Sequence, residues 1–169
     1  MLSRFPGSMK KTLSCLVVML GVVWTAEAAK TGPQLGQRIE AVRTTAYTYG
    51  AECNGDYPAS NALGQPLKAG KVRSAAADWS LYPVGTRFRV VETGQDYVVD
   101  DYGSAMVGNG TIDLFKPSSR EMSRWGVRKV TIEILEWGSP EKSLKILSER
   151  KKLRHIREMV SRLQAQQVI

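Results

Sequence analysis

Glycine interrupts the chain between residues 41 and 138 so often that only short elements fit between the interruptions. In the runs 86–91 and 130–134, apolar residues alternate with polar ones, a period of two that is typical of half-buried strands. The interrupting glycines are Gly50, Gly55, Gly64, Gly70, Gly85, Gly94, Gly103, Gly108, Gly110 and Gly126. Such frequent punctuation favours a small all-β barrel with tight corners.

Two further short strands are expected at residues 43–49, which are rich in Thr and Tyr, and at residues 97–99. One short helix is predicted from Pro117 to Arg124. Ser118 or Ser119 is its expected N-cap, and Gly126 its expected stop. These elements place the barrel domain at residues 41–138.

Beyond residue 138 the pattern becomes helical. Ser139-Pro140-Glu141 is a helix-start signature, and apolar residues then recur with a loose helical period. Residues 139–169 carry 8 basic and 3 acidic residues, so we expect a basic helical tail. Three interpretations of this tail stay open: a solvated helix that is docked on the barrel or frayed, attraction to anionic wall polymer or a membrane surface, or a dimerising helix.

The barrel region is nearly neutral, because residues 29–138 carry 13 basic and 12 acidic residues. A basic nucleic-acid binder would carry its charge on the folded domain. The net charge of +8 for the whole chain therefore does not indicate a nucleic-acid partner.

Residues 1–28 have the pattern of a secretory signal peptide: Lys10-Lys11, an apolar run of 12 residues from Leu13 to Trp24, and Ala26-Glu27-Ala28 as a cleavage site. The alternative is an uncleaved anchor, although a membrane-spanning helix needs roughly 20 apolar residues. We expect cleavage after Ala28, a short linker over residues 29–40, and export to the periplasm or cell-wall space.

Cys53 would be the one cysteine left after that cleavage, either buried or paired between chains. One Cys and one His, His155, do not supply the usual zinc ligands. We therefore expect no metal and no other cofactor.

Three aspartates, Asp78, Asp101 and Asp113, lie among apolar, small or β-type residues. Carboxylates held close together in such surroundings repel, so one of them keeps its proton to a higher pH and can protonate a glycosidic oxygen. Asp100 could share that proton, and the glycines near Asp101 would let a polymer approach the backbone. Candidate substrate contacts here are Asp100, Gly103 and Ser104. The alternative, that the aspartates only cap turns, stays open on spacing alone.

Taken in order, four segments resemble the 3D domain family, which is named for three aspartates. They are Thr45-Ala46-Tyr47-Thr48; Ala77-Asp78 with Pro83-Val84-Gly85-Thr86; Asp101-Tyr102-Gly103-Ser104-Ala105-Met106-Val107-Gly108; and Ile112-Asp113. The resemblance covers residues 44–135. That family is similar to the catalytic barrel of the lytic transglycosylase MltA, so the resemblance implies a double-psi β-barrel and cleavage of the glycan strands of peptidoglycan.

The resemblance also implies roles. Asp113 would protonate the bond between N-acetylmuramic acid and N-acetylglucosamine, then take the proton of the C6 hydroxyl as it closes on C1 to give a 1,6-anhydro sugar. Asp101 would tune or position it, and Asp78 would support the site or hold substrate. Thr45 and Tyr47 are implied as sugar contacts.

The second hypothesis is a non-catalytic barrel that binds cell-wall glycan. Val107 stands where the family has Lys, which removes a possible substrate cation, and the domain is small. Both features favour binding over catalysis.

Overall fold

The computed structural model describes residues 34–49 and 60–167, which all belong to one unit of the chain. The expected signal peptide 1–28, the expected cleavage after Ala28 and the interpretations of Cys53 lie outside the described residues. So do residues 29–33 of the expected linker 29–40, and the first strand already begins within that range, at Arg38.

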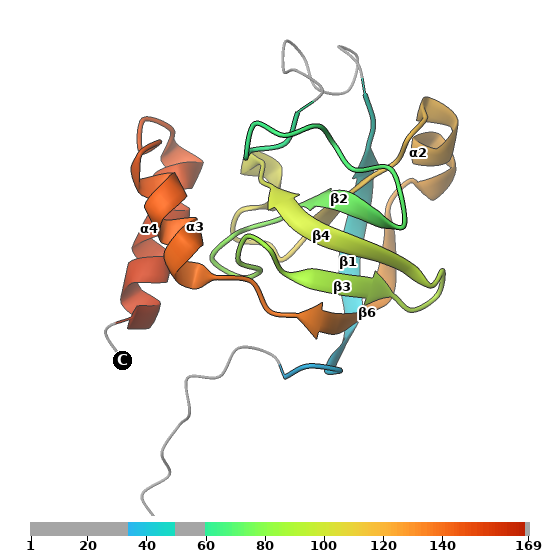
Figure 1. Ribbon diagram of the computed structural model, residues 1–169, viewed down its shortest axis with the longest axis horizontal. Coiled ribbons are helices and arrows are strands. Elements are labelled where there is room, and N and C mark those ends of the chain that lie inside the picture. The colour runs from blue at the N-terminus through green and yellow to red at the C-terminus, as the bar shows by residue number, and fades with distance from the viewer. Residues whose placement is uncertain (1–33, 50–59, 168–169) are drawn as a thin grey trace, which may run out of the picture. The chain divides into compact units, whose positions relative to one another are not determined.

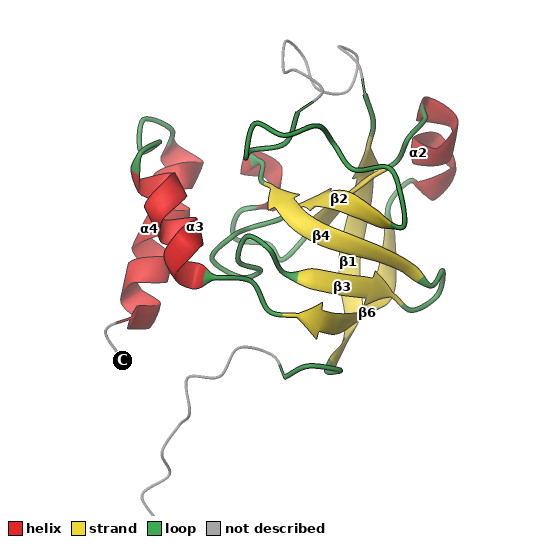
Figure 2. Cartoon of the chain, viewed as in Figure 1, coloured by secondary structure: helices red, strands yellow, loops and turns green. Residues whose placement is uncertain are grey.

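Six strands close into a barrel in the order β1-β5-β2-β4-β3-β6 (Figures 1 and 2). The strands are β1 (Arg38–Tyr47), β2 (Val72–Ala76), β3 (Arg87–Val90), β4 (Gln95–Asp101), β5 (Ile112–Phe115) and β6 (Arg128–Glu136). Two pairs are parallel, β1 with β5 and β2 with β4, and the other neighbours are antiparallel. The prediction of an all-β chain built on a small barrel is confirmed.

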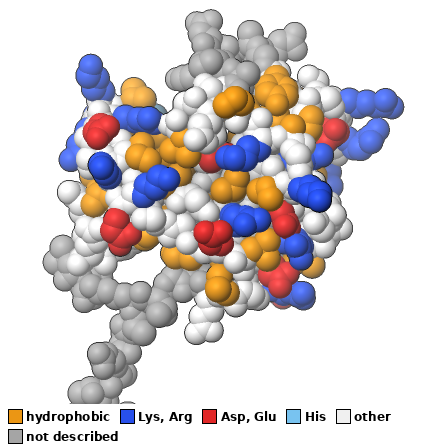
Figure 3. Space-filling model, in the orientation of Figure 1, with side chains coloured by type: hydrophobic (Ala, Val, Ile, Leu, Met, Phe, Trp, Pro, Cys, Tyr) orange, Lys and Arg blue, Asp and Glu red, His pale blue; other side chains and the backbone are white. Residues whose placement is uncertain are grey.

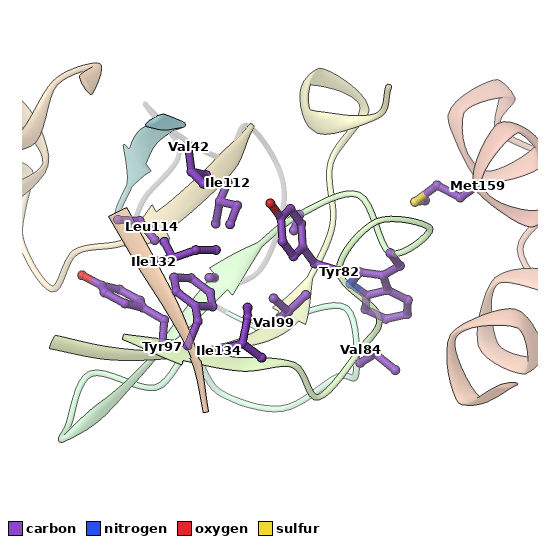
Figure 4. Close-up of a cluster of buried hydrophobic side chains, with 14 of the residues drawn as sticks. Val42, Tyr82, Val84, Tyr97, Val99, Ile112, Leu114, Ile132, Ile134 and Met159 are labelled. Carbon is purple, nitrogen blue, oxygen red and sulfur yellow. The ribbon is translucent and has the colours of Figure 1, made fainter. Parts of the chain in front are cut away.

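The main core fills the barrel with residues that alternate along the strands, as a two-residue period requires. On β5, Ile112 and Leu114 are fully buried in this core, as are Ile132 and Ile134 on β6. Figure 4 shows Ile112, Leu114 and Ile132 gathered between the strands. Because Ile112 and Leu114 point inward, Asp113 between them lies on the outer face of the barrel wall.

The short helix α2 (Ser119–Trp125) begins two residues later than predicted. Its N-cap is Ser118, whose hydroxyl accepts a hydrogen bond from the backbone N–H of Glu121. Gly126 ends the helix with φ +61°, a left-handed conformation that glycine adopts without strain. The capping residues named from the sequence are therefore correct, and the helix starts after Pro117 because Ser118 occupies the cap.

The tail is two helices, α3 (Pro140–Ser148) and α4 (Arg154–Gln167), rather than one. We call residues 140–167 the hairpin. Leu147, Ile156 and Met159 are buried in the main core cluster, so the hairpin is packed on the barrel; Met159 reaches toward it in Figure 4. The break over residues 149–153 turns the chain so that both helices can pack. Within the described ranges, no helix is both long and apolar enough to cross a bilayer.

Candidate functional site

A β-bulge in β4 decides where Asp101 points. Along the parallel pair, Ala75 is opposite Val99 but Ala76 is opposite Asp101, so Asp100 is an extra residue in β4. An extra residue reverses the facing of the side chain that follows it. Val99 is fully buried in the main core, whereas Asp101 is partly exposed. The bulge thus turns Asp101 out of the barrel interior.

Asp113 reaches the same outer face from the other side of β2. Ala76 is the register partner of both Asp101 on β4 and Asp113 on β5. Neighbouring strands are about 4.8 Å apart, so the two aspartate Cα atoms flank Ala76 at a separation of about 10 Å. The outer face therefore carries two partly exposed aspartates separated by one small side chain.

Thr45 fixes the Asp113 side chain. In the parallel pair of β1 and β5, Thr45 is the register partner of Asp113, and its hydroxyl donates a hydrogen bond of 2.7 Å to the Asp113 Oδ1. This contact holds the carboxyl group in one orientation. Thr45 is itself partly exposed, so the expected sugar contact remains geometrically accessible.

Both carboxyl groups hold protons more strongly than a free aspartate. Burial raises the pKa of Asp101 to about 6, with a further upward contribution from the charges of Asp100 and Asp113; hydrogen bonds from the Tyr102 and Ala62 amides act in the opposite direction. Burial also raises the pKa of Asp113, against the lowering effect of the Thr45 hydrogen bond. A proton is thus available on this face under mildly acidic conditions.

Tyr47 lies on the same side of β1 as Thr45, two residues further along the strand. Its ring packs edge-on against Phe115 in a second cluster that also contains Leu67, Ala76 and Met106. Burial first, and then the charges of Asp101, Asp100 and Asp113, raise the pKa of the Tyr47 phenol far above its usual value. The hydroxyl is buried and has no hydrogen-bond partner among the described residues. A sugar contact would require it to become exposed.

Asp100 is placed differently from a substrate contact. It is only 2% exposed, and its Oδ2 accepts hydrogen bonds from Asn61, Lys68 and Ser74. The Lys68 ammonium lies 2.6 Å away and balances its charge. The bulge residue is therefore held inside the protein, where it anchors β4 and the segment 61–68 next to the site.

Asp78 is fully buried and acts through the protein rather than at its surface. One oxygen accepts hydrogen bonds from the Ser80 amide and hydroxyl. The other accepts from the backbone N–H of Gly108 and from the guanidinium of Arg162 on α4, both at 2.9 Å. The structure does not bring Asp78 onto the face of Asp101 and Asp113. Its contacts support the loop that follows Asp101 and leave it no access to a substrate.

Gly103 and Ser104 begin that loop, where Ser104 opens the 3₁₀ turn η1 (Ser104–Met106). Ser104 is exposed and Gly103 partly exposed. The side chain of Met106 lies against the Cα of Gly103 and is buried with Tyr47 in the second cluster. Gly103 and Ser104 thus border the outer face and remain accessible to a ligand.

A separate cavity of about 260 Å³ lies beside α2, away from the aspartates. Its lining residues are Thr93, Lys116, Glu121, Arg124, Trp125 and Arg128. The Lys116 ammonium donates to the Tyr97 hydroxyl and sits 3.8 Å above the Trp125 ring, and burial lowers its pKa to about 8. These contacts account for the lysine as a partner of two aromatic residues. Among the described residues, no three His, Cys, Asp or Glu side chains could share a metal ion.

Sequence reasoning missed the residues that support the site. Asn61, Lys68 and Ser74 surround Asp100, and Arg150 and Arg162 reach the site region from the hairpin. Arginines within a basic tail give no local signal of such contacts. The tertiary fold brings all five residues near the site.

Comparison with known proteins agrees with the resemblance noted in the sequence. Residues 73–136 match the 3D domain. The chain is 32% identical over 111 residues to the cell wall-binding protein YocH of Bacillus subtilis, covering 65% of this chain and 37% of YocH. It is 36% identical over 100 residues to YabE of the same organism, named for a proposed role in cell wall shaping, covering 58% of this chain and 23% of YabE. The matches span about a third and a quarter of these relatives.

Proposed function

Because residues 73–136 of this chain match the 3D domain, we propose that it acts on the bacterial cell wall as an exported lytic transglycosylase, with the glycan strands of peptidoglycan as substrate. The observation that carries the proposal is the pair Asp101 and Asp113 on one outer face, with the pKa of each raised by burial. The names of the two relatives support a cell-wall setting. The pattern of residues 1–28 supports export to the periplasm or wall space.

In the proposed reaction, Asp113 is first a general acid. Burial raises the pKa of this carboxyl group above the usual aspartate value, which favours its protonated form, and the Thr45 hydrogen bond to Oδ1 fixes its orientation. The proton passes to the oxygen between N-acetylmuramic acid and N-acetylglucosamine as the C1–O bond breaks. The resulting carboxylate takes the proton of the C6 hydroxyl, whose oxygen bonds to C1. The products are a new chain end and a 1,6-anhydro sugar, and no water is consumed.

Asp101 has a supporting part in this proposal. The two carboxyl groups flank Ala76, and the negative charge of Asp113, when ionised, raises the pKa of Asp101, because like charges disfavour each other. The substrate supplies its own nucleophile, so no second carboxylate has to attack or activate water, unlike in the two-carboxylate hydrolases. Ser104 and Gly103 border the outer face on which the glycan substrate would lie.

The test is the Asp113→Asn variant incubated with purified sacculi. The proposal expects the wild-type chain to release 1,6-anhydromuropeptides, detected by mass spectrometry, and the variant to release at least about 100-fold less. Thr45→Val is the graded companion, since it removes the orienting hydroxyl but keeps the acid; it should lower release less. Circular dichroism checks that both variants fold. Ordinary reducing ends in the products would show a hydrolase instead.

The alternative function is a non-catalytic barrel that binds cell-wall glycan. It is supported by the name of YocH, a cell wall-binding protein. In this case neither the wild-type chain nor Asp113→Asn releases soluble sugar, and both bind sacculi with the same affinity. The sacculus experiment therefore separates the two functions in one assay.

A further inference from the structure

Arg150, in the turn that follows α3, reaches across to the barrel and touches two segments at once. Its guanidinium Nη1 donates to the backbone carbonyl of Ala62 at 2.8 Å and to the Tyr102 hydroxyl at 3.2 Å. Ala62 and Tyr102 are far apart in the chain, and neither lies in the hairpin. One side chain thus connects the hairpin to both segments.

The same two residues present backbone amides to Asp101. The backbone N–H of Tyr102 donates to the Asp101 Oδ1 at 2.9 Å, and the nearby Ala62 amide lowers the pKa of this carboxyl group. Arg150 binds the carbonyl of one of these residues and the side chain of the other. The contacts of Arg150 and the contacts of Asp101 therefore converge on one pair of residues.

Aromatic packing completes the placement of Tyr102. The Trp79 ring meets the Tyr102 ring edge-on at 4.9 Å, and the Trp79 Nε1 donates to the carbonyl of Asp101 at 2.8 Å. On the hairpin side, the His155 ring lies 6.3 Å from the Tyr102 ring. Tyr102 is thus held between a barrel residue that fixes the Asp101 backbone and two hairpin residues, His155 and Arg150.

The hairpin is a firm base for Arg150. The backbone N–H of Arg150 donates to the carbonyl of Leu147, which is fully buried in the main core. The Ser143 hydroxyl accepts a hydrogen bond from the Val84 amide, and Arg162 pairs with the buried Asp78. A side chain that extends from such a base can fix the atoms it binds, whereas one on a frayed tail cannot.

We propose that Arg150 is a positioning residue for Asp101, so that the hairpin is a working part of the aspartate site rather than an appendage of the barrel. Its catalytic consequence rests on the proposed function, but the placement of Asp101 does not. The hairpin would set the geometry of the two amides, and the amides would set how readily Asp101 gives up its proton.

The groups that face Asp101 define the direction of the effect. After burial, the charges of Asp100 on β4 and Asp113 on β5 raise the pKa of Asp101. The charges of all three aspartates also raise the pKa of the Tyr47 phenol on β1. Lys68 is paired with Asp100, and His155 faces Tyr102 rather than the carboxyl group. Against these, the Tyr102 and Ala62 amides lower the pKa of Asp101. Moving these two amides away from the carboxyl group should therefore raise the pKa of Asp101 further.

The test follows the titration of the Asp101 carboxyl carbon by NMR in the whole chain, with the signal assigned by its loss in Asp101→Asn. We compare Arg150→Met, which keeps the aliphatic stem but removes the donors, with Arg154→Met. Arg154 belongs to the same hairpin, is exposed and pairs with Glu158 one helical turn away, so its replacement is the matched control. We expect the midpoint to rise by about half a pH unit in Arg150→Met and to stay unchanged in the control.

Hydrogen exchange at the Ala62 and Tyr102 amides is the second readout, and it should accelerate in Arg150→Met alone. If that variant unfolds, Tyr102→Phe removes only the hydroxyl contact and should give the same changes in smaller degree. Unchanged titration and unchanged exchange in a folded Arg150→Met would overturn the proposal. Neither readout needs sugar release, so a chain without transglycosylase activity would refute the proposed function and leave this inference standing.

Discussion

At the scale of single residues, ionisation of the partly buried Asp101 lowers the free energy of unfolding. A carboxyl group that is buried enough to hold its proton to a pKa of about 6 is unfavourable when ionised. The unfolded chain has the ordinary aspartate pKa of 3.8. Between these values the folded state binds more protons than the unfolded state, so the free energy of unfolding falls as the pH rises through this window.

Asp101→Asn removes that pH dependence. Since asparagine carries no charge and can still accept from the Tyr102 amide, the variant should be more stable than wild type at pH 7 by about 1 to 2 kcal/mol. At pH 4 the difference should nearly vanish. Urea unfolding at both pH values measures this. Asp96→Asn is the control, because Asp96 pairs with Arg89 and its loss should give no gain at either pH. Equal stability of Asp101→Asn and wild type at pH 7 would contradict the interpretation.

At the scale of elements, the joint between barrel and hairpin depends on a glycine. Gly138 follows β6, and its Cα lies so close to the segment 83–86 that a Cβ atom would meet the backbone N of Thr86 at 2.6 Å. The Gly138 N–H donates to the Thr86 hydroxyl, and the Ser139 N–H donates to the Val84 carbonyl. The hairpin therefore starts from a point where two backbones touch and no side chain fits.

Gly138→Ala should separate those two backbones. The neighbouring atoms are backbone atoms that cannot turn away, so overpacking should destabilise the fold by about 2 kcal/mol and weaken the docking of α3. Chemical denaturation measures the loss of stability. Faster hydrogen exchange of the Val84 amide would show that the contact between barrel and α3 is weakened. Gly70→Ala is the matched control, because nothing lies within 4 Å of a Cβ there and its φ is not in the left-handed region. A loss of similar size at Gly70 would show a general effect of removing glycine.

The predictability of the elements follows from how local their signals are. The helix caps Ser118 and Gly126 could be named because each acts within one turn. Strand β2 was missed because Ser74, Ala75 and Ala76 are all buried, so no alternation marks them. The bulge at Asp100 left no signal either, and without it the sequence puts Asp101 on the same face as Val99. The sequence named Asp101 and Asp113 as site residues, and their roles stay a prediction. The contacts of Arg150 with Ala62 and Tyr102 could not be predicted, because they depend on tertiary structure.

At the scale of the whole molecule, positive charge gathers on the exposed side of the hairpin. Figure 3 shows Lys and Arg side chains over this region, and the exposed lysines of the hairpin are Lys142, Lys145, Lys151 and Lys152. The opposite side of both helices is buried in the core. Deleting the hairpin to test its charge would expose that core, so neutral replacements are the cleaner experiment.

Replacing the four exposed lysines with glutamine should weaken binding to sacculi at low salt if the hairpin is attracted to anionic wall polymer. The effect should shrink as salt approaches roughly 1 M, where the screening length falls to about 3 Å. A charge-matched control replaces four exposed cations of the barrel with glutamine: Arg38, Lys71, Arg120 and Lys129. Pull-down of both variants over a salt series measures the difference. Equal loss in both sets would indicate net charge alone, and no loss in either would remove the idea.

The pairing of the first strand with the last two has a kinetic consequence. Thr45 and Asp113, which form the site contact between β1 and β5, are 68 residues apart, and Arg38 pairs with Glu133. The ring of strands cannot close before β6 has been made, so nearly the entire chain must be available before the aspartate face exists. Non-local pairing of this kind slows folding. A polypeptide that emerges N-terminus first therefore cannot close the barrel until β6, its final strand, has appeared.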